Sequence, residues 1–279
     1  MNTGVDEQKF VAIVLAGDRS NADPVAAHSG TSCKAVADIY GKPMVTRVLD
    51  ALQASGRVKS IILCGPAQTG LDECPELLNR IETDGIQWLR NSESPSRSVE
   101  TALELVDESE PVFLTTADHA LLSADIVRYF LSEALDNQVD FNVGLVDYST
   151  VQSAYPEVKR TVIKLKEKGV CGCNLFAIMT LEGRKLVSFW RNVEQSRKKP
   201  AKMLAGVLGV GGVLSYLLHR LTIEGALEKV SSRLGVKVKP VILPFARAGI
   251  DVDTVKDKLL IEKILANDSV TVSSEKPAN

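Results

Sequence analysis

The chain has no excess of charge of either sign. Its 279 residues include 33 Lys and Arg against 35 Asp and Glu, which gives a formal net charge of −2. Because there is no global basic field to attract a polyanion, we do not expect a nucleic acid as the main partner. Charged residues make up 24% of the chain and hydrophobic residues 45%, proportions that exclude a wholly disordered, collagen-like or coiled-coil protein.

Cysteine and N-terminal apolar residues are also scarce. Five cysteines scattered through a chain of this length do not form a disulfide framework, which indicates a reducing compartment. Residues 1–9 are polar and acidic, and they lack the apolar core of a signal peptide. We therefore expect a cytoplasmic protein.

Short apolar runs alternate with helix-length segments in the first half of the chain. The expected strands are Phe10–Leu15, 60–64 and 111–116, and the expected helices are 43–54, 71–82 and 96–106. Because the strands are apolar throughout, helices should cover both faces of their sheet. The alternation predicts a parallel sheet with right-handed crossovers, which binds ligands beyond the carboxyl ends of its strands.

The second half of the chain has a different pattern. The expected strands are 141–146, 160–166, 174–179 and 237–243, with a mostly helical stretch over 181–235 and a last helix over 254–266. We interpret residues 8–266 as one domain, with a helical insertion at 184–235 that is first basic and then apolar. The Ser-, Thr- and Lys-rich tail, 267–279, is expected to be flexible.

The apolar part of this insertion has no formal charge over residues 203–219. As a helix of about 17 residues it would span about 26 Å, short of the roughly 30 Å of a hydrocarbon core. Its four glycines weaken a helix in water. The pattern favours a buried or partner-packed helical segment, and the alternative is peripheral contact with lipid through 197–220, because the flanks are basic.

The first candidate site follows the first strand. Gly17 at the end of a buried strand allows backbone N–H groups to approach phosphates closely. Arg19 and Lys34 can neutralise a triphosphate, Arg as a bidentate fork and Lys as a point charge. The alternative is a surface loop with incidental charges.

The second candidate is Asp118, which follows the strand 111–116. A lone carboxylate in the ligand crevice is costly unless it meets a cation. One or two carboxylates together with substrate phosphates are typical of a Mg²⁺ site. The alternative role is to cap the next helix, for which Ser123 is better placed. For His119 we predict a local hydrogen bond rather than a ligand role.

The third candidate is the pair Asp251 and Asp253, just before the last helix. Their alternating positions place both carboxylates on one face of an extended segment, which suits a second metal contact. The alternative is simple helix capping, in which Thr254 pairs with Asp257 three residues later.

Three other patterns are weak. The glycines of 206–212 are spaced like a dinucleotide fingerprint, but no strand precedes them. Cys171 and Cys173 form one short pair without a second pair, which does not support a zinc site. No Gly-x-Ser-x-Gly sequence occurs, so a serine hydrolase is not indicated.

Taken together, the motifs resemble those of the MobA-like nucleotidyltransferases. This family includes molybdenum cofactor guanylyltransferase and the sugar- and polyol-phosphate cytidylyltransferases. The segments that carry the resemblance are, in chain order, Leu15-Ala16-Gly17, Lys34, Gly41-Lys42-Pro43-Met44, Ser94 to Leu103, Thr116-Ala117-Asp118, Gly172 to Phe176, and Asp251 to Thr254. The chain departs from the family pattern at Asp18, where a second glycine is usual, and in a longer loop before Lys34.

The resemblance implies a three-layer α/β/α GT-A-like fold with a mostly parallel central sheet and a helical insertion. It also implies transfer of a nucleotidyl group from an NTP, CTP or GTP first among them, to a phosphorylated small-molecule acceptor with release of pyrophosphate. The cofactor implied is Mg²⁺, with Mn²⁺ as a substitute. The alternatives are a GT-A glycosyltransferase, whose Asp-x-Asp pair is not found at 118–120, and a non-catalytic nucleotide-binding or membrane-associated protein.

The resemblance also assigns roles residue by residue. It implies that Lys34, Arg19 and Asp118 are catalytic, with Leu15, Ala16 and Gly17 beside the triphosphate. It places Arg97 and Ser98 near the base or ribose, and Lys164 and Asn174 near the acceptor. Asp118 and Asp253 would hold the metal, with Asp251 as the lesser ligand.

Overall fold

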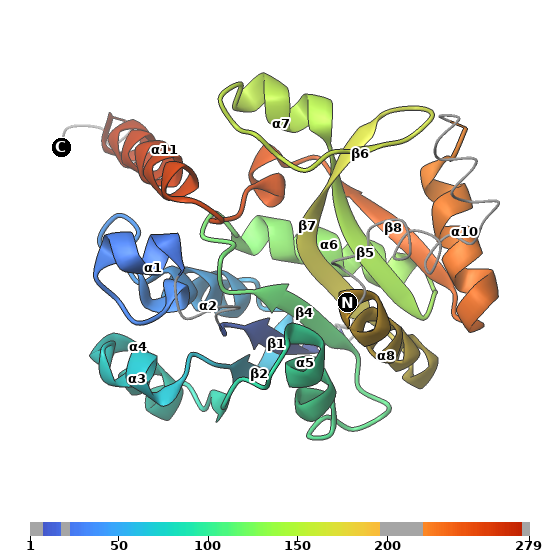
Figure 1. The fold of residues 1–279 in the computed structure, drawn as a ribbon, viewed down its shortest axis with the longest axis horizontal. Coiled ribbons are helices and arrows are strands. Elements are labelled where there is room, and N and C mark those ends of the chain that lie inside the picture. The colour runs from blue at the N-terminus through green and yellow to red at the C-terminus, as the bar shows by residue number, and fades with distance from the viewer. Residues whose placement is uncertain (1–7, 18–22, 196–219, 275–279) are drawn as a thin grey trace, which may run out of the picture.

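The protein folds around one eight-stranded sheet (Figure 1). The computed structural model describes residues 8–17, 23–195 and 220–274. The strands are β1 (Phe10–Leu15), β2 (Val58–Cys64), β3 (Gln87–Leu89), β4 (Val112–Thr116), β5 (Phe141–Asp147), β6 (Ile163–Lys164), β7 (Gly169–Ile178) and β8 (Val238–Leu243). Their order is β3-β2-β1-β4-β7-β5-β8, with β6 paired to β7.

Most strand pairs are parallel, as the alternation of strands and helices predicts. β1 is parallel to both β2 and β4, β2 is parallel to β3, and β5 is parallel to β8. The exception is β7, which runs antiparallel to β4, β5 and β6. The sheet is therefore mostly parallel, with one reversed strand beside its centre.

Helices cover both faces of this sheet, which confirms the three-layer α/β/α arrangement (Figure 1). On one side lie α1 (Pro24–Ser29), α2 (Met44–Ala54), α3 (Gln68–Asp72), α4 (Pro75–Thr83), α6 (Ala124–Asp136), α7 (Tyr148–Ala154) and α11 (Val255–Ser274). On the other side lie α5 (Pro95–Leu103), α8 (Leu181–Gln195) and α10 (Ile223–Leu234). Two short 3₁₀ turns complete the elements, η1 (Lys34–Val36) and η2 (Ala246–Gly249).

The strand β1 shows why its sequence is apolar throughout. Phe10, Ala12 and Val14 pack into the core under α2 and α6, whereas Val11 and Ile13 pack into the core under α5 and α8. All five side chains are buried. A strand buried on both faces has no solvent side, so its sequence does not alternate with polar residues.

Several predicted boundaries differ from the structure. The helix expected over 71–82 is two helices, because Pro75 occupies the first turn of α4 and starts a new one. The strand expected over 160–166 is reduced to the two residues of β6, and the one expected at 174–179 begins five residues earlier. The three-residue edge strand β3 was not predicted, because it is too short for a periodic pattern.

The last helix is longer than the predicted 254–266. No glycine or proline interrupts residues 255–274, and α11 continues to Ser274. Arg247 contributes to this extension, because its Nη1 and Nη2 each donate to Asp268, at 2.7 Å. The helix therefore includes residues 267–274 of the predicted tail.

The predicted insertion at 184–235 includes most of α8 and all of α10. Its apolar part, 203–219, and nearly all of the segment proposed for lipid contact, 197–220, lie outside the described residues. Within the parts of the chain that are described, no helix combines the length and apolar character needed to cross a membrane.

Candidate active site

A cleft of about 380 Å³ lies beyond the carboxyl ends of β1 and β4, where ligands bind in parallel sheets. Its volume is in the range of small-molecule sites. The cleft is lined by Leu15, Ala16, Gly17, Asp23, Lys34, Ala35, Pro95, Leu114, Thr116, Ala117, Asp118, Asn174, Phe176, Trp190 and Asp253. Members of all three candidate sites, Gly17 and Lys34, Asp118, and Asp253, therefore line one cleft.

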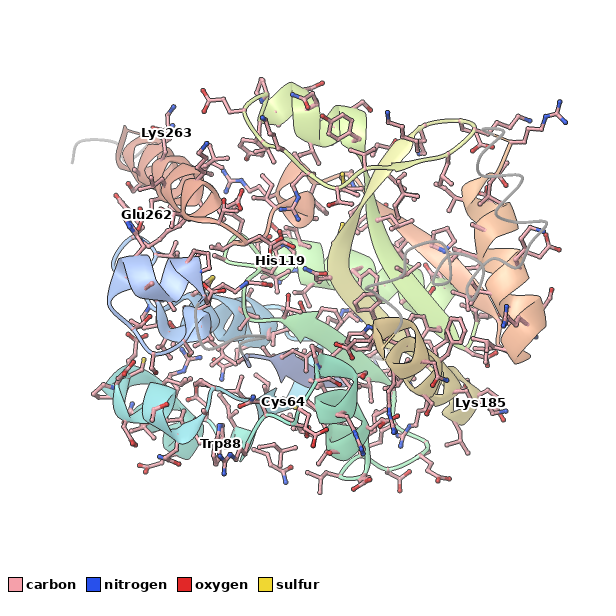
Figure 2. All side chains as sticks on the ribbon, viewed as in Figure 1. Cys64, Trp88, His119, Lys185, Glu262 and Lys263 are labelled. Carbon is pink, nitrogen blue, oxygen red and sulfur yellow. The ribbon has the colours of Figure 1, made fainter. Side chains whose placement is uncertain are left out.

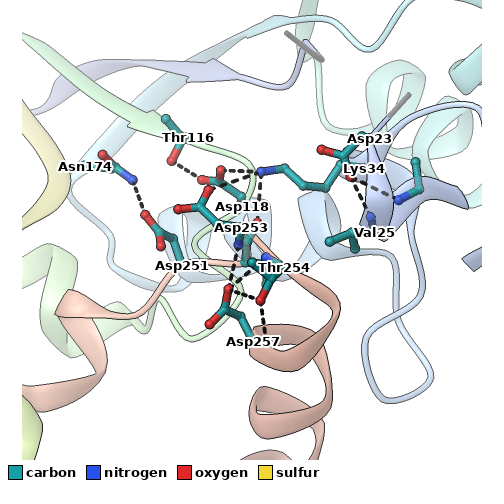
Figure 3. A network of polar contacts seen from close by, with 12 residues as sticks. Asp23, Val25, Lys34, Thr116, Asp118, Asn174, Asp251, Asp253, Thr254 and Asp257 are labelled. Atoms are coloured by element: carbon teal, nitrogen blue, oxygen red, sulfur yellow. Dashed lines mark hydrogen bonds and ion pairs between the residues drawn. The ribbon is translucent and has the colours of Figure 1, made fainter. Parts of the chain in front are cut away.

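Lys34 lies between two carboxylates of this cleft (Figure 3). Its Nζ donates to Asp118 Oδ2 at 2.8 Å and to the carbonyl oxygen of Val252 at 2.9 Å. Asp253 Oδ1 lies 3.8 Å from the same nitrogen. The structure thus brings together the lysine and the two carboxylates that were expected to share a site.

The ion pair between Lys34 and Asp118 is mostly shielded from water, with the side chains 16% and 18% exposed. Burial alone would raise the pKa of Asp118, but the charge and hydrogen bond of Lys34 outweigh it and leave this pKa below its usual value. Burial likewise acts to lower the pKa of Lys34, and attraction to Asp118 leaves it raised. Both groups are therefore charged at neutral pH.

Asp118 is fixed by its neighbours as well as by Lys34. The hydroxyl of Thr116 donates to Asp118 Oδ1 at 2.5 Å. The backbone N–H of Val252 donates to the backbone carbonyl of Asp118 at 2.9 Å, which joins the loop after β4 to the segment before α11. These bonds set the separation of the two carboxylates through the backbone, before any ligand binds.

Asp251 belongs to a different arrangement. It forms an ion pair with Arg160 through Oδ1, and Asn174 Nδ2 donates to its Oδ2 at 2.8 Å (Figure 3). Both oxygens are occupied, and the side chains of Asp251 and Arg160 are only 13% and 11% exposed. Asn174 has a positive φ of 53°, a conformation that asparagine tolerates better than most residues. In this structure Asp251 therefore contacts Arg160 and Asn174, whereas Asp118 and Asp253 lie beside Lys34.

A divalent cation nevertheless fits the other two carboxylates. Burial and the nearby Asp251 and Asp118 raise the pKa of Asp253 in spite of Lys34, and a bound cation would favour its charged form. Oxygen ligands from one or two carboxylates are what Mg²⁺ usually takes from a protein. Among the described residues, no three Asp, Glu, His or Cys side chains form a metal cluster. The remaining ligands would have to be substrate phosphates and water.

The Arg160–Asp251 pair gives a testable prediction. Arg160→Met should lower the free energy of unfolding by about 3 kcal/mol, because it leaves a buried carboxylate without its cation. Lys168→Met is the matched control, since it removes a lysine paired with Asp147 at 2.6 Å that is 37% exposed, and it should cost no more than about 1 kcal/mol. Denaturant unfolding measures both. Equal losses in the two variants would contradict this account of Asp251.

The predicted phosphate-binding residues divide into two groups. Leu15, Ala16 and Gly17 line the cleft, and a Cβ added to Gly17 would lie 2.8 Å from Asn91 Cβ. Glycine is therefore required there by the close approach of Asn91, in addition to any approach by a ligand. Arg19 lies outside the described residues.

The residues predicted near the base or the acceptor do not all reach the cleft. Ser98 is buried, and its hydroxyl accepts the backbone N–H of Ser92 at 2.9 Å. Arg97 and Lys164 are exposed and do not line the cleft. Of these four predicted contacts, only Asn174 faces it.

The local capping predictions agree with the structure. Ser123 accepts the backbone N–H of Ile126 at the start of α6. Thr254 and Asp257 cap α11 reciprocally, because each side chain accepts the backbone N–H of the other residue. His119 is buried, and its Nε2 lies 3.3 Å from the carbonyl oxygen of Arg247.

Two contributions to the cleft were not predicted from the sequence. Asp23 reaches it from the start of α1, where its carboxylate also accepts the N–H groups of Val25 and Ala26. Trp190 reaches it from α8, within the region taken as an insertion. Neither has a local sequence signal, since both are brought in by tertiary packing.

Comparison with known proteins agrees with this geometry. A hypothetical transferase from Thermus thermophilus is 28% identical, covers 90% of this chain and 100% of its own, and has a TM-score of 0.76. Two structures share the fold at lower identity. One is a CMP:2-keto-3-deoxy-manno-octonic acid synthetase complexed with CTP (13% identity, 94% of this chain, 99% of its own, TM-score 0.55). The other is a 4-diphosphocytidyl-2C-methyl-D-erythritol synthase from Anaerococcus prevotii (11%, 94%, 100%, 0.54). No curated protein matches the chain.

The fold and the cleft thus define a GT-A-like, three-layer nucleotidyltransferase architecture. Residues 12–150 match the MobA-like NTP transferase domain, and this part of the chain belongs to that family. The resemblance inferred from the motifs is confirmed, and the chain is a nucleotidyltransferase.

Proposed function

We propose that the protein transfers a nucleotidyl group from an NTP to a phosphorylated small molecule, with Mg²⁺ or Mn²⁺ as cofactor and pyrophosphate as the second product. The observation that supports this is the convergence of Lys34, Asp118 and Asp253 in one cleft. Among the described residues that line it, three carboxylates, Asp23, Asp118 and Asp253, accompany one cation, Lys34. A triphosphate would be repelled by such a cleft unless a metal ion entered with it.

The residues have distinct roles in this proposal. Asp118 and Asp253 would hold the metal ion, which supplies positive charge to the phosphates when bound. Lys34 is oriented by Asp118 and Val252, and places its ammonium where phosphate oxygens would enter. Thr116 keeps the Asp118 carboxylate in a fixed orientation. Preorganised charge of this kind is the main contribution that proteins make to phosphoryl-group transfer.

The reaction needs no general base. A phosphate oxygen of the acceptor forms a bond to the α-phosphorus of the NTP, and the bond from that phosphorus to the β-phosphate oxygen breaks. Pyrophosphate leaves with the electron pair. The attacking phosphate is already an anion, so no proton has to be removed, and positioning of the two substrates is the principal requirement.

For the nucleotide we propose CTP first and GTP second. Two of the proteins that share the fold are named for cytidylyl chemistry, one of them in complex with CTP. The MobA-like family supplies the alternative of GTP.

The experiment measures nucleotide binding and pyrophosphate release separately. Each of the four NTPs is titrated into the protein by calorimetry with Mg²⁺, with Mn²⁺ and with EDTA, and pyrophosphate is then assayed with sugar, polyol and alkyl phosphates as acceptors. We expect metal-dependent binding, strongest for CTP, which weakens at least tenfold in EDTA. Absence of NTP binding, or hydrolysis of nucleotide sugars in place of pyrophosphate release, would reject the proposal.

A further inference from the structure

A second pocket, of about 230 Å³, adjoins the cleft on the α5–α8 side of the sheet. Leu114, Phe176 and Trp190 line both spaces, so they share a wall. The remaining lining comes mainly from Leu186, Val187 and Phe189 of α8. We call this space the apolar pocket, because its lining contains no charged side chain and no side-chain hydroxyl or amide among the described residues.

The cleft and the apolar pocket lie one after the other along the same face of the sheet. Leu114 of β4 is paired with Phe176 of β7, and both line the apolar pocket. Thr116 lies two residues beyond Leu114, and Asn174 two residues before Phe176, and both line the cleft. Side chains two apart in a strand share a face and are separated by about 7 Å. The polar pair Thr116 and Asn174, beside Asp118, is therefore followed about 7 Å along the strands by the apolar pair Leu114 and Phe176.

The helix α8 covers the apolar pocket. Val187 is buried there, whereas Leu186, Phe189 and Trp190 are half-buried and retain surface that a ligand could cover. The rings of Phe141 and Phe176 are tilted by 43° to each other, with centroids 6.0 Å apart, and both line the pocket. A nucleobase would leave its donors and acceptors without partners in this pocket, which is unfavourable. A hydrocarbon group would not.

The position of the apolar pocket relative to the cleft indicates which substrate binds in it. Of the residues expected to face the triphosphate, Gly17 follows β1 and Lys34 contacts Asp118 after β4, whereas Asn174 and Phe176 lie on β7, the next strand beyond β4. The apolar pocket adjoins the cleft at β7. A molecule that enters it from the cleft would hold its phosphate beside Thr116 and Asn174.

We propose that the acceptor is a phosphate monoester of a hydrocarbon alcohol, with its phosphate in the cleft and its alkyl group in the apolar pocket. This inference rests on the proposed function and specifies the acceptor class. The acceptor phosphate oxygen bonds to the α-phosphorus, pyrophosphate leaves, and the product is a nucleoside diphosphate ester of the hydrocarbon.

The experiment uses Trp190 as a fluorescent reporter. The chain has two tryptophans, and Trp88 lies on β3, at the far edge of the sheet from β7 and well away from α8 (Figure 2). In a Trp88→Phe background, the emission comes from Trp190 alone. Ethyl, butyl and octyl phosphate are titrated at concentrations where each is monomeric, with inorganic phosphate as the reference.

We expect octyl phosphate to bind at least tenfold more tightly than butyl phosphate and to shift the Trp190 emission to shorter wavelength. Each buried methylene contributes about 0.8 kcal/mol, which is about fourfold in affinity. Leu186→Asp should remove the dependence on chain length, whereas Lys185→Asp, on the exposed side of α8, should leave it unchanged.

Four results would overturn the inference. The first is equal affinity for ethyl and octyl phosphate, and the second is the same chain-length dependence in Leu186→Asp. The third is a Trp190 emission that varies with protein concentration, which would mean that a second copy of the chain covers the pocket. The fourth is pyrophosphate release with sugar phosphates but not with octyl phosphate, which would reject this acceptor class and leave the proposed function in place. Absence of NTP binding would reject the proposed function instead.

Discussion

Replacing Asp118 with asparagine should reduce the rate of pyrophosphate release by about 10²–10³-fold, the usual cost of removing one preorganised electrostatic group. Asparagine has nearly the same shape and can still accept the hydroxyl of Thr116. It has no charge, so Lys34 loses its nearest counter-ion and the metal ion of the proposed mechanism would lose a carboxylate ligand. We also expect weaker Mg²⁺-dependent NTP binding in calorimetry.

The matched control is Asp136→Asn, at the exposed carboxyl end of α6. It makes the same chemical change away from the cleft and should leave the rate within twofold. If circular dichroism confirms the fold of Asp118→Asn and its rate of pyrophosphate release stays within twofold of the unchanged protein, Asp118 is not part of the active site.

Lys34→Met should both inactivate the enzyme and destabilise it. We expect the free energy of unfolding to fall by about 3 kcal/mol, because the largely buried Asp118 carboxylate loses its partner. The rate of pyrophosphate release should fall by about 10²-fold or more, since Lys34 is the one cation among the described residues that line the cleft. Chemical denaturation in metal-free buffer and the pyrophosphate assay measure the two effects.

The double variant Lys34→Met, Asp118→Asn separates stability from catalysis. Without the carboxylate no buried charge is left unpaired, so at least half of the lost stability should return. Activity should not return, because both charged groups are still missing. If stability stays as low as in Lys34→Met, packing of the lysine stem, rather than its charge, would be the cause.

Much of the fold follows from local pattern. The buried strands β1 and β4 were predicted almost to the residue, because an apolar run ended by glycine or aspartate has few other interpretations. The orientation of β7 was not predictable in this way. Its residues match a strand in either direction, and its antiparallel pairing with β4 and β5 is set by packing between segments far apart in the chain.

The candidate site was predictable where motifs lie at strand or helix ends. Lys34, Asp118 and Asp253 were identified by type and position, and the structure brings them together. The ion pair of Asp251 was not predicted, because its partner Arg160 lies in the loop before β6 and is 91 residues away. No spacing within a short window signals such a pair. The apolar contribution of Trp190 was missed for the same reason.

The bond between Val252 and Asp118 has a consequence for how the protein is made. Its partners are separated by more than 130 positions, and Lys34 donates to the carbonyl of the same valine. During translation, β1, β4 and the lysine therefore leave the ribosome well before Val252 and Asp253. Until that later segment is made, the ammonium of Lys34 lacks the carbonyl of Val252 and the carboxylate of Asp253 as neighbours.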